Sequence, residues 1–236
     1  MKVDYHIHLE EGQYSSGWLK RTFEAIIHLS ESHHKAHSRE WMQEATALLE
    51  KRIMNGPYSP EWLDLYLKQA KRLGLKEVGI VDHLYRFKEY KSYYEKHIDL
   101  GNHKLGRLQR KWLGQVCVES IQSFIARIES AREKWKANGI ELRLGVEADF
   151  FLNGEQELND ILSQHEFDYV IGSIHFIKGW GFDNPETQHL FLEHDLSALY
   201  NDFFQLVETA ISTKLFDVMA HLDNLKVFGH RQMKTI

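Results

Sequence analysis

Five segments of this chain end a strand-like apolar run on histidine or carboxylate residues, and this recurrence constrains the fold more than any other feature. The segments are VDYHIHL with His6 and His8, VGIVDH with Asp82 and His83, LRLGVEAD with Glu147, YVIGSIHF with His175, and VMAHLD with His221 and Asp223. Helical patterns separate the runs, and strands that alternate with helices build a parallel sheet. In such a sheet, chemistry gathers at the carboxyl ends of the strands. The sequence therefore predicts an α/β fold with one polar site at these strand ends.

The residue types at the strand ends indicate that this site binds metal. Residues two apart in a strand face the same side, so His6 and His8 project together. Glu147 lies in an apolar run, where an ionised carboxylate is costly unless it is paired or bound to metal. Taken singly, each remaining histidine is more typical of a satisfied hydrogen bond than of a ligand. Counted together, the five endings favour one polyvalent metal site, because all of them repeat one position in one supersecondary unit.

The length of the chain suits one large domain or two small ones, and no linker divides it. The 236 residues are 43% hydrophobic and contain 3 prolines with no Gly/Ser-rich linker, so we expect a single domain over residues 1–236. The formal charge of −5, with basic and acidic residues intermixed, argues against a long nucleic-acid partner. The single cysteine, Cys117, excludes an internal disulfide framework and a zinc site built on several thiolates. Without a signal-peptide pattern or a run of about 18 apolar residues, we expect a cytoplasmic protein with no membrane partner.

Helix signals fill the intervals between the strands. The clearest starts at Ser59 and Pro60, which suit the cap and the first helical position, and ends at Gly74. The other expected helices span residues 18–28, 39–54, 116–137, 155–165 and 196–213, and the strands after the first span 78–81, 141–149, 169–176 and 217–221. Residues 84–114 are expected to form a loop with short helices over the active face. The polar stretch containing His33, His34 and His37 is interpreted as a solvated loop rather than a metal cluster.

At these motifs the chain resembles the PHP (polymerase and histidinol phosphatase) superfamily, and within it the histidinol-phosphatase branch. The resemblance rests on the H-x-H of DYHIHLEEG, the IVDH of the second strand, GVEADF, GSIHF followed closely by GWGFDNP, and AHLD. It implies an irregular, TIM-like (βα)7 barrel. It also implies two or three divalent metal ions, which are zinc, iron or manganese.

The resemblance assigns the metal ligands residue by residue. It implies that His6 and His8 hold one ion, and that Glu147 bridges it to a second ion bound by His175 and His221. It places His83 at a third ion, with Glu11 as a possible substitute for the family's early-loop ligand. The family's closing Asp-x-His does not follow the AHLD motif. We therefore expect the barrel to lack its last strands in this chain, and the natural product to extend further.

The function implied by the resemblance is hydrolysis of a small phosphorylated metabolite, L-histidinol phosphate, in histidine biosynthesis. A metal-bridging hydroxide would attack phosphorus, because a slow phosphate monoester needs a strong nucleophile and charge neutralisation. Glu147 and His175 are the catalytic candidates. Asp82 is either a partner that orients an imidazole or a plain strand-end cap.

Basic and aromatic residues near the motifs are candidates for binding the substrate. Lys178 and Arg107 would add positive charge near the phosphate, although Arg107 and Arg86, as single basic residues, are more often solvated surface residues. Trp180 and Phe182 are candidates for packing on the imidazole of the substrate, and core packing is at least as typical of them.

Two alternative functions stay open at this point. One is a PHP-type phosphodiesterase or nuclease, which the net acidity disfavours. The other is an inactive metal-binding regulatory protein, which the missing Asp-x-His favours. The sequence leaves open the oligomeric state, the identity and number of metal ions, and the group that protonates the leaving alkoxide.

Overall fold

The computed structural model describes residues 1–30 and 32–230. The chain divides into two compact units. The first consists of Met1–Asp82 and Glu119–Leu144, and the second of His83–Val118 and Gly145–Ile236.

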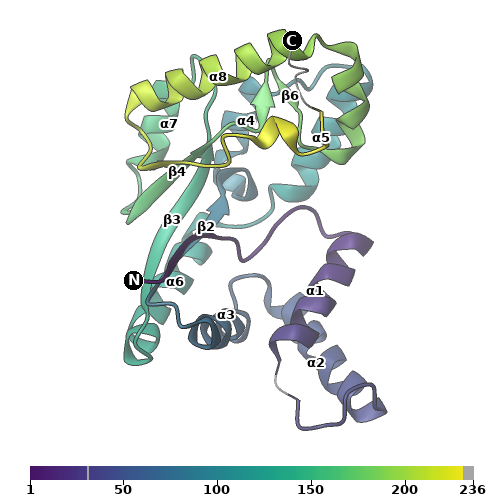
Figure 1. Cartoon of the computed structure of the whole chain (residues 1–236), viewed down its shortest axis with the longest axis vertical. Coiled ribbons are helices and arrows are strands. Elements are labelled where there is room, and N and C mark those ends of the chain that lie inside the picture. Colours follow the sequence, from purple (N-terminus) through teal and green to yellow (C-terminus); the bar gives the residue numbers. More distant parts are fainter. Residues whose placement is uncertain (31, 231–236) are drawn as a thin grey trace, which may run out of the picture. The chain divides into compact units, whose positions relative to one another are not determined.

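The first unit pairs parallel strands and carries helices on them. Its elements are β1 (Val3–Ile7), α1 (Ser16–Leu29), α2 (Arg39–Asn55), α3 (Pro60–Leu73), β2 (Glu77–His83), α6 (Ile121–Ala137) and the start of β3 (Glu141–Asp149). Strand β1 runs parallel to β2, with Val3 opposite Glu77 and Ile7 opposite Ile80. Helices α1 and α2 lie side by side (Figure 1).

Serine caps start the three long helices between β1 and β2. The side chains of Ser15, Ser38 and Ser59 each accept a hydrogen bond from the backbone amide three residues further on. Pro60 occupies the first turn of α3, and Gly74 closes this helix with a left-handed φ of 68°. The predicted boundaries of α3 are therefore confirmed, because each rests on a local conformational rule.

A buried ion pair anchors helix α2 within the first unit. The guanidinium of Arg52 contacts the carboxylate of Glu10, and both residues are only 3% exposed. The same guanidinium lies 5.5 Å from the ring centroid of Trp18 and 4.8 Å from that of Trp62. The Trp18 indole N–H also donates to Glu10, at 2.6 Å. The pair therefore connects α2 to the loop that follows β1.

Replacing Glu10 with alanine should lower the free energy of unfolding by about 3–5 kcal/mol, because it leaves a buried charge without its partner. Urea unfolding of Glu10→Ala and of the unchanged chain measures this difference. The matched control is Glu24→Ala on α1, whose exposed pair with Lys20 at 4.0 Å should contribute less than about 1 kcal/mol. Equal unfolding midpoints for Glu10→Ala and the unchanged chain would show that the tryptophan faces alone support Arg52.

The second unit also builds on parallel strands. It contains η1 (Leu84–Arg86), η2 (Lys88–Tyr90), α4 (Lys91–His97), α5 (Lys104–Val116), the end of β3, α7 (Glu155–Leu162), β4 (Tyr169–Ser173), β5 (Phe176–Ile177), β6 (Trp180–Gly181), η3 (Pro185–Glu193), α8 (Leu196–Thr213), β7 (Val218–Met219) and η4 (Asn224–Lys226). Strand β4 lies between β3 and β7, and both pairings are parallel. Figure 1 shows β3 and β4 next to each other. The prediction of an α/β fold with parallel strands is confirmed.

The strand predicted over 169–176 is shorter and ends in a hairpin. β4 stops at Ser173, and β5 then pairs antiparallel with β6. The two residues between them, Lys178 and Gly179, have φ values of 52° and 81°. Positive φ at both central positions is the geometry of a tight hairpin turn.

The largest error in the predicted helices concerns residues 104–137. The region up to 114, expected to be a loop with short helices, contains the 13-residue helix α5. The helix expected over 116–137 begins only at Ile121. The buried stripe of α5 includes Gly106 and Gln109, which do not look like core residues in the sequence. Gln109 is buried because its amide bonds the backbone of Asp99, Gly179 and Gly181.

Trp180 and Phe182 are core residues rather than substrate contacts. They are 5% and 0% exposed and pack in a cluster with Phe191 and Phe203. Burial of such large aromatic rings stabilises the unit by hydrophobic transfer. Of the two alternatives predicted for these rings, core packing is the one that the structure supports.

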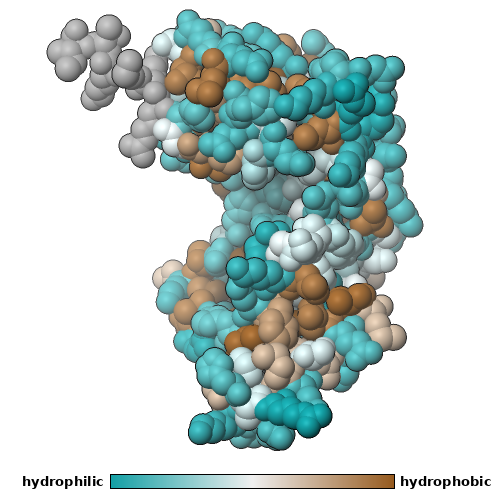
Figure 2. All heavy atoms as spheres, turned by 90° about the vertical axis from the view of Figure 1, so that its right-hand side faces the viewer, coloured by the Kyte–Doolittle hydropathy of each residue, from teal (hydrophilic) through white to brown (hydrophobic). Residues whose placement is uncertain are grey.

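The surface carries no large uniform patch on the face drawn in Figure 2, where hydrophobic residues form small groups among hydrophilic ones. His33, His34 and His37 are exposed in the segment between α1 and α2, so the solvated-loop interpretation is confirmed. Within residues 1–30 and 32–230, no helix has the length and apolar character that crossing a membrane requires.

Candidate metal centre

Three histidines of the second unit lie close to one buried carboxylate. Glu147, near the end of β3, is 0% exposed. Its Oε1 atom lies 3.0 Å from Nε2 of His221 and 3.6 Å from Nε2 of His175, and its Oε2 atom lies 3.3 Å from Nδ1 of His83. The histidines come from the ends of β2, β4 and β7. The predicted convergence of strand ends is therefore present for these four residues.

The orientation of His175 is fixed by a second carboxylate. Its Nδ1 atom lies 2.7 Å from Oδ1 of Asp149, which leaves Nε2 directed at Glu147. Burial alone lowers the pKa of His175, but the charge of Asp149 and its hydrogen bond, followed by Asp183 and Glu147, raise this pKa to about 10. The cluster therefore attracts positive charge strongly.

Tyrosines fix Asp149 in turn. The Tyr94 hydroxyl donates to Oδ2 of Asp149 at 2.9 Å, and the Tyr93 hydroxyl donates to its backbone carbonyl at 3.0 Å. A carboxylate that orients a histidine in this way is the usual outer partner of a metal-ligating imidazole.

The donor set fits a divalent metal ion. Two ligand atoms about 2.0–2.2 Å from one tetrahedral ion lie roughly 3.3–3.6 Å apart. The three N···O separations around Glu147, from 3.0 to 3.6 Å, are close to that spacing. Imidazole with carboxylate suits zinc, iron or manganese better than calcium. His83, His175 and His221 each therefore lie at ligand spacing from the carboxylate of Glu147.

An aromatic wall borders this cluster. The ring of Tyr85 stacks on the imidazole of His83, with centroids 4.5 Å apart and an interplanar angle of 14°. Trp112 packs against Tyr85 at 5.0 Å. Burial, followed by the charges of Asp183 and Asp149, raises the pKa of Tyr85 well above its ordinary value. Burial likewise raises the pKa of the Asp183 carboxyl, against the opposing charge of a nearby histidine.

The first unit places its own candidate ligands at the end of β1. The rings of His6 and His8 lie 5.0 Å apart, and Nε2 of His8 lies 3.8 Å from a carboxylate oxygen of Glu11. His6 is exposed, whereas the side chain of His8 is largely buried. Within this unit, the H-x-H pair therefore projects together as predicted.

Asp82 fixes the loop that follows β1. Its carboxylate accepts hydrogen bonds from the Leu9 amide at 2.7 Å and from the Tyr58 hydroxyl at 2.8 Å. The Tyr66 hydroxyl donates to the carbonyl of His8 at 3.1 Å. Asp82 is thus a structural anchor beside His8, and its role toward an imidazole stays a prediction.

The basic substrate-binding candidates have other partners. The side chain of Lys178 is 79% exposed and pairs with Asp202 at 2.6 Å. Arg107 donates to the carbonyl of Asn102 at 2.8 Å. Arg86 is completely buried, so the expectation of a surface position for it was wrong.

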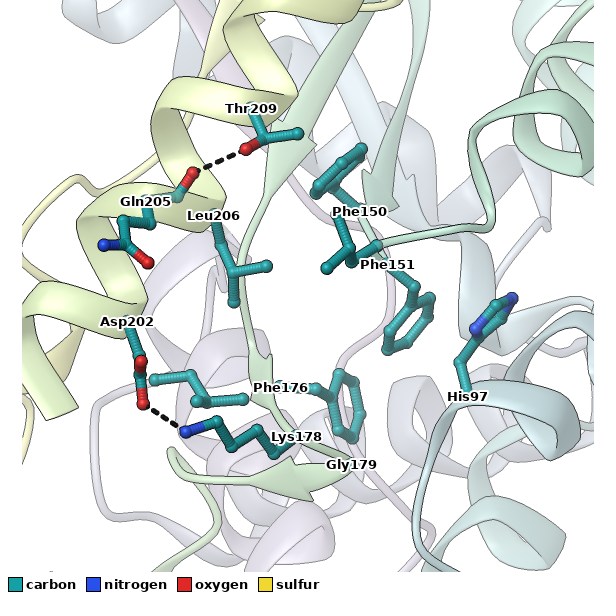
Figure 3. Close-up of a pocket in the computed structure, with 12 residues that line it drawn as sticks. His97, Phe150, Phe151, Phe176, Lys178, Gly179, Asp202, Gln205, Leu206 and Thr209 are labelled. Carbon is teal, nitrogen blue, oxygen red and sulfur yellow. Dashed lines mark hydrogen bonds and ion pairs between the residues drawn. The ribbon is translucent and has the colours of Figure 1, made fainter.

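Lys178 borders a pocket of about 430 Å³ in the second unit (Figure 3). Phe150, Phe151 and Phe176 form its aromatic side, and α8 supplies Asp202, whose ion pair with Lys178 is drawn in Figure 3. The residues that line this pocket include none of His83, Glu147, His175 and His221. This pocket is therefore distinct from the histidine–carboxylate cluster.

The sequence interpretation missed three residues of this region, which are Asp149, Asp183 and Tyr85. Asp149 had a usable signal, because it lies two positions after Glu147 in the same strand and shares its face. Asp183 also had a signal, because it lies inside the GWGFDNP motif. Tyr85 had none, since it lies in a short helix whose path depends on tertiary packing.

Parallel strands that end on imidazoles around a buried carboxylate define an α/β protein of the kind that binds metal ions at its strand ends. The model of the PHP domain matches residues 59–236, most of the chain, so the chain belongs to the PHP domain family. The resemblance drawn from the sequence is thereby confirmed.

Two relatives are histidinol phosphatases by name. The chain is 42% identical over 113 residues to a probable histidinol-phosphatase of Deinococcus radiodurans. The matched segment covers 48% of this chain and 43% of the Deinococcus radiodurans protein. It also resembles the crystal structure of histidinol phosphate phosphatase from Lactococcus lactis complexed with zinc, L-histidinol and phosphate, at 17% identity and a TM-score of 0.51. That match covers 95% of this chain and 59% of the other, and at this identity it shows the fold alone. The chain thus spans less than two thirds of either relative. The irregular (βα)7 barrel, the missing last strands and the single domain over residues 1–236 stay predictions.

Proposed function

We propose that this protein is a PHP-type, metal-dependent phosphomonoesterase that hydrolyses L-histidinol phosphate to L-histidinol and phosphate. The observation that carries the proposal is the convergence of His83, His175 and His221 on the fully buried carboxylate of Glu147. Membership of the PHP family and the names of the two relatives support the phosphatase reaction and its substrate.

The proposed metal ligands of the second unit are the four residues of this cluster. The family resemblance adds His6, His8 and Glu11 of the first unit to the proposed set. The zinc in the Lactococcus lactis complex makes zinc the first metal to test with this chain. The proposal gives Glu147 the bridging position between two ions.

Divalent ions bound at these residues would neutralise phosphoryl oxygens and lower the pKa of water, the two requirements for hydrolysing a phosphate monoester. The chain itself supplies orientation. Asp149 holds the Nδ1 side of His175 and leaves Nε2 for its ligand role. Glu147 contributes negative charge where the imidazoles of three strands meet. The burial of this charge keeps water from competing for it.

The zinc-loaded protein should release phosphate from L-histidinol phosphate faster than it cleaves a dinucleotide, by about 10²-fold or more in kcat/KM, because a site selects by transition-state contacts. Parallel assays of the two substrates with the same protein and metal measure this ratio. Comparable or faster cleavage of the phosphodiester would replace the phosphatase proposal with the nuclease alternative. Metal binding without turnover of either substrate would favour a regulatory protein.

A further inference from the structure

Hydrogen-bond donors are scarce around the histidine–carboxylate cluster of the second unit. Glu147, Asp149 and Asp183 offer acceptors when ionised, and a phosphate group is itself an acceptor. The hydroxyls of Tyr93 and Tyr94 are already bound to Asp149. A phosphate monoester therefore meets few uncommitted donors from this part of the chain.

The three basic residues that were considered near the substrate do not fill that gap. Lys178 is paired with Asp202, and Arg107 donates to the carbonyl of Asn102. Arg86 has no exposed surface, so a substrate entering from solvent does not reach it.

Tyr85 is placed differently, because it is only partly buried, whereas Arg86 is fully buried. Its ring lies flat on the imidazole of His83, and Trp112 packs on it at 5.0 Å, so its position is well defined. The imidazole on which it stacks lies 3.3 Å from the carboxylate of Glu147, so the ring borders the cluster. Among the residues that the structure describes, none accepts a hydrogen bond from this hydroxyl. A phenolic hydroxyl can donate one hydrogen bond.

We propose that the Tyr85 hydroxyl is the hydrogen-bond donor that the second unit presents to the phosphoryl group of the substrate. Tyr85 is then a catalytic residue that touches the substrate, while its ring keeps the imidazole of His83 in place. This inference rests on the proposed function, because it needs a phosphate group bound at the cluster. A donor aimed at developing charge on a phosphoryl oxygen stabilises the transition state without first reorganising.

Tyr85→Phe tests the hydroxyl alone, because phenylalanine keeps the ring that stacks on His83. The zinc-loaded variant should lose roughly 10- to 100-fold in kcat with L-histidinol phosphate. This loss is smaller than the loss on removing a donor that stabilises an oxyanion alone, because the metal ions also neutralise the phosphoryl charge. Its zinc content and melting temperature should equal those of the unchanged protein. The matched control is Tyr90→Phe, five residues further on, whose hydroxyl contacts His165 outside the cluster and whose loss should leave kcat unchanged.

The remaining outcomes separate this inference from the proposed function. Full activity of Tyr85→Phe overturns the inference, and so does a loss of activity in proportion to a loss of zinc, which would show a structural role through His83. If the unchanged protein hydrolyses no phosphomonoester, the proposed function fails. The inference is then decided by calorimetric titration of the zinc-loaded proteins with inorganic phosphate. Weaker binding by Tyr85→Phe supports it, and equal affinity overturns it.

Discussion

Glu147→Gln should remove most of the bound metal and nearly all of the phosphatase activity. The carboxylate of Glu147 is fully buried and lies within 3.6 Å of three imidazole nitrogens, so its charge is the one feature that all three histidines share. Glutamine keeps the shape of the side chain and deletes this charge. Metal ions contribute several kcal/mol of charge stabilisation to such reactions, so their loss should lower the rate by roughly 10³-fold. Metal analysis of protein purified without chelator, together with phosphate release, measures both effects.

Glu141→Gln is the matched control for this substitution, because Glu141 begins the same strand with an exposed side chain. It should bind metal and release phosphate like the unchanged protein. If Glu147→Gln retains the full metal stoichiometry, the proposed bridging position is wrong. If both variants lose metal equally, the effect belongs to the strand and not to the buried carboxylate.

The cluster around Glu147 was predictable because its residues interrupt apolar strands. A buried carboxylate in the run LRLGVEAD needs a charged partner or a metal ion. In a parallel sheet, such partners lie at the carboxyl ends of the neighbouring strands. His83, His175 and His221 were found by the same reasoning. The pairings of β3 with β4 and of β4 with β7 bring the strand ends that carry His175 and His221 close to Glu147.

Other parts of the chain depend on contacts that the sequence does not reveal. Helix α3 was predicted closely because Ser59, Pro60 and Gly74 act locally. Helix α5 was missed because Gln109 is buried by hydrogen bonds to backbone groups up to 72 residues away. Tyr85 was missed for a related reason. Its stacking on His83 depends on the short helix after β2, which carries no periodic signal.

The rule that residues two apart in a strand face the same side would also have identified Asp149. The spacing of two residues that pairs His6 with His8 also places Asp149 on the face of Glu147. In the structure, its carboxylate holds Nδ1 of His175 at 2.7 Å. The sequence interpretation treated Asp149 only as the end of a strand. A carboxylate two positions from a buried ligand is therefore a signal for the outer partner of a metal-binding histidine.

Asp149→Asn should weaken metal binding and lower phosphatase activity by about 10- to 100-fold, the usual effect of removing the partner that orients a ligating histidine. Asparagine can still bond Nδ1 of His175 through its oxygen, but it brings no negative charge to the imidazole. Added zinc should restore part of the activity, because the ligands themselves remain. The control is Asp160→Asn, an exposed carboxylate on α7 that bonds only Gln156 among the described hydrogen bonds, and this variant should titrate like the unchanged protein. Zinc titrations of the three proteins decide the matter. An unchanged zinc affinity for Asp149→Asn would mean that the tyrosines and the packing around His175, rather than the charge of Asp149, set its orientation.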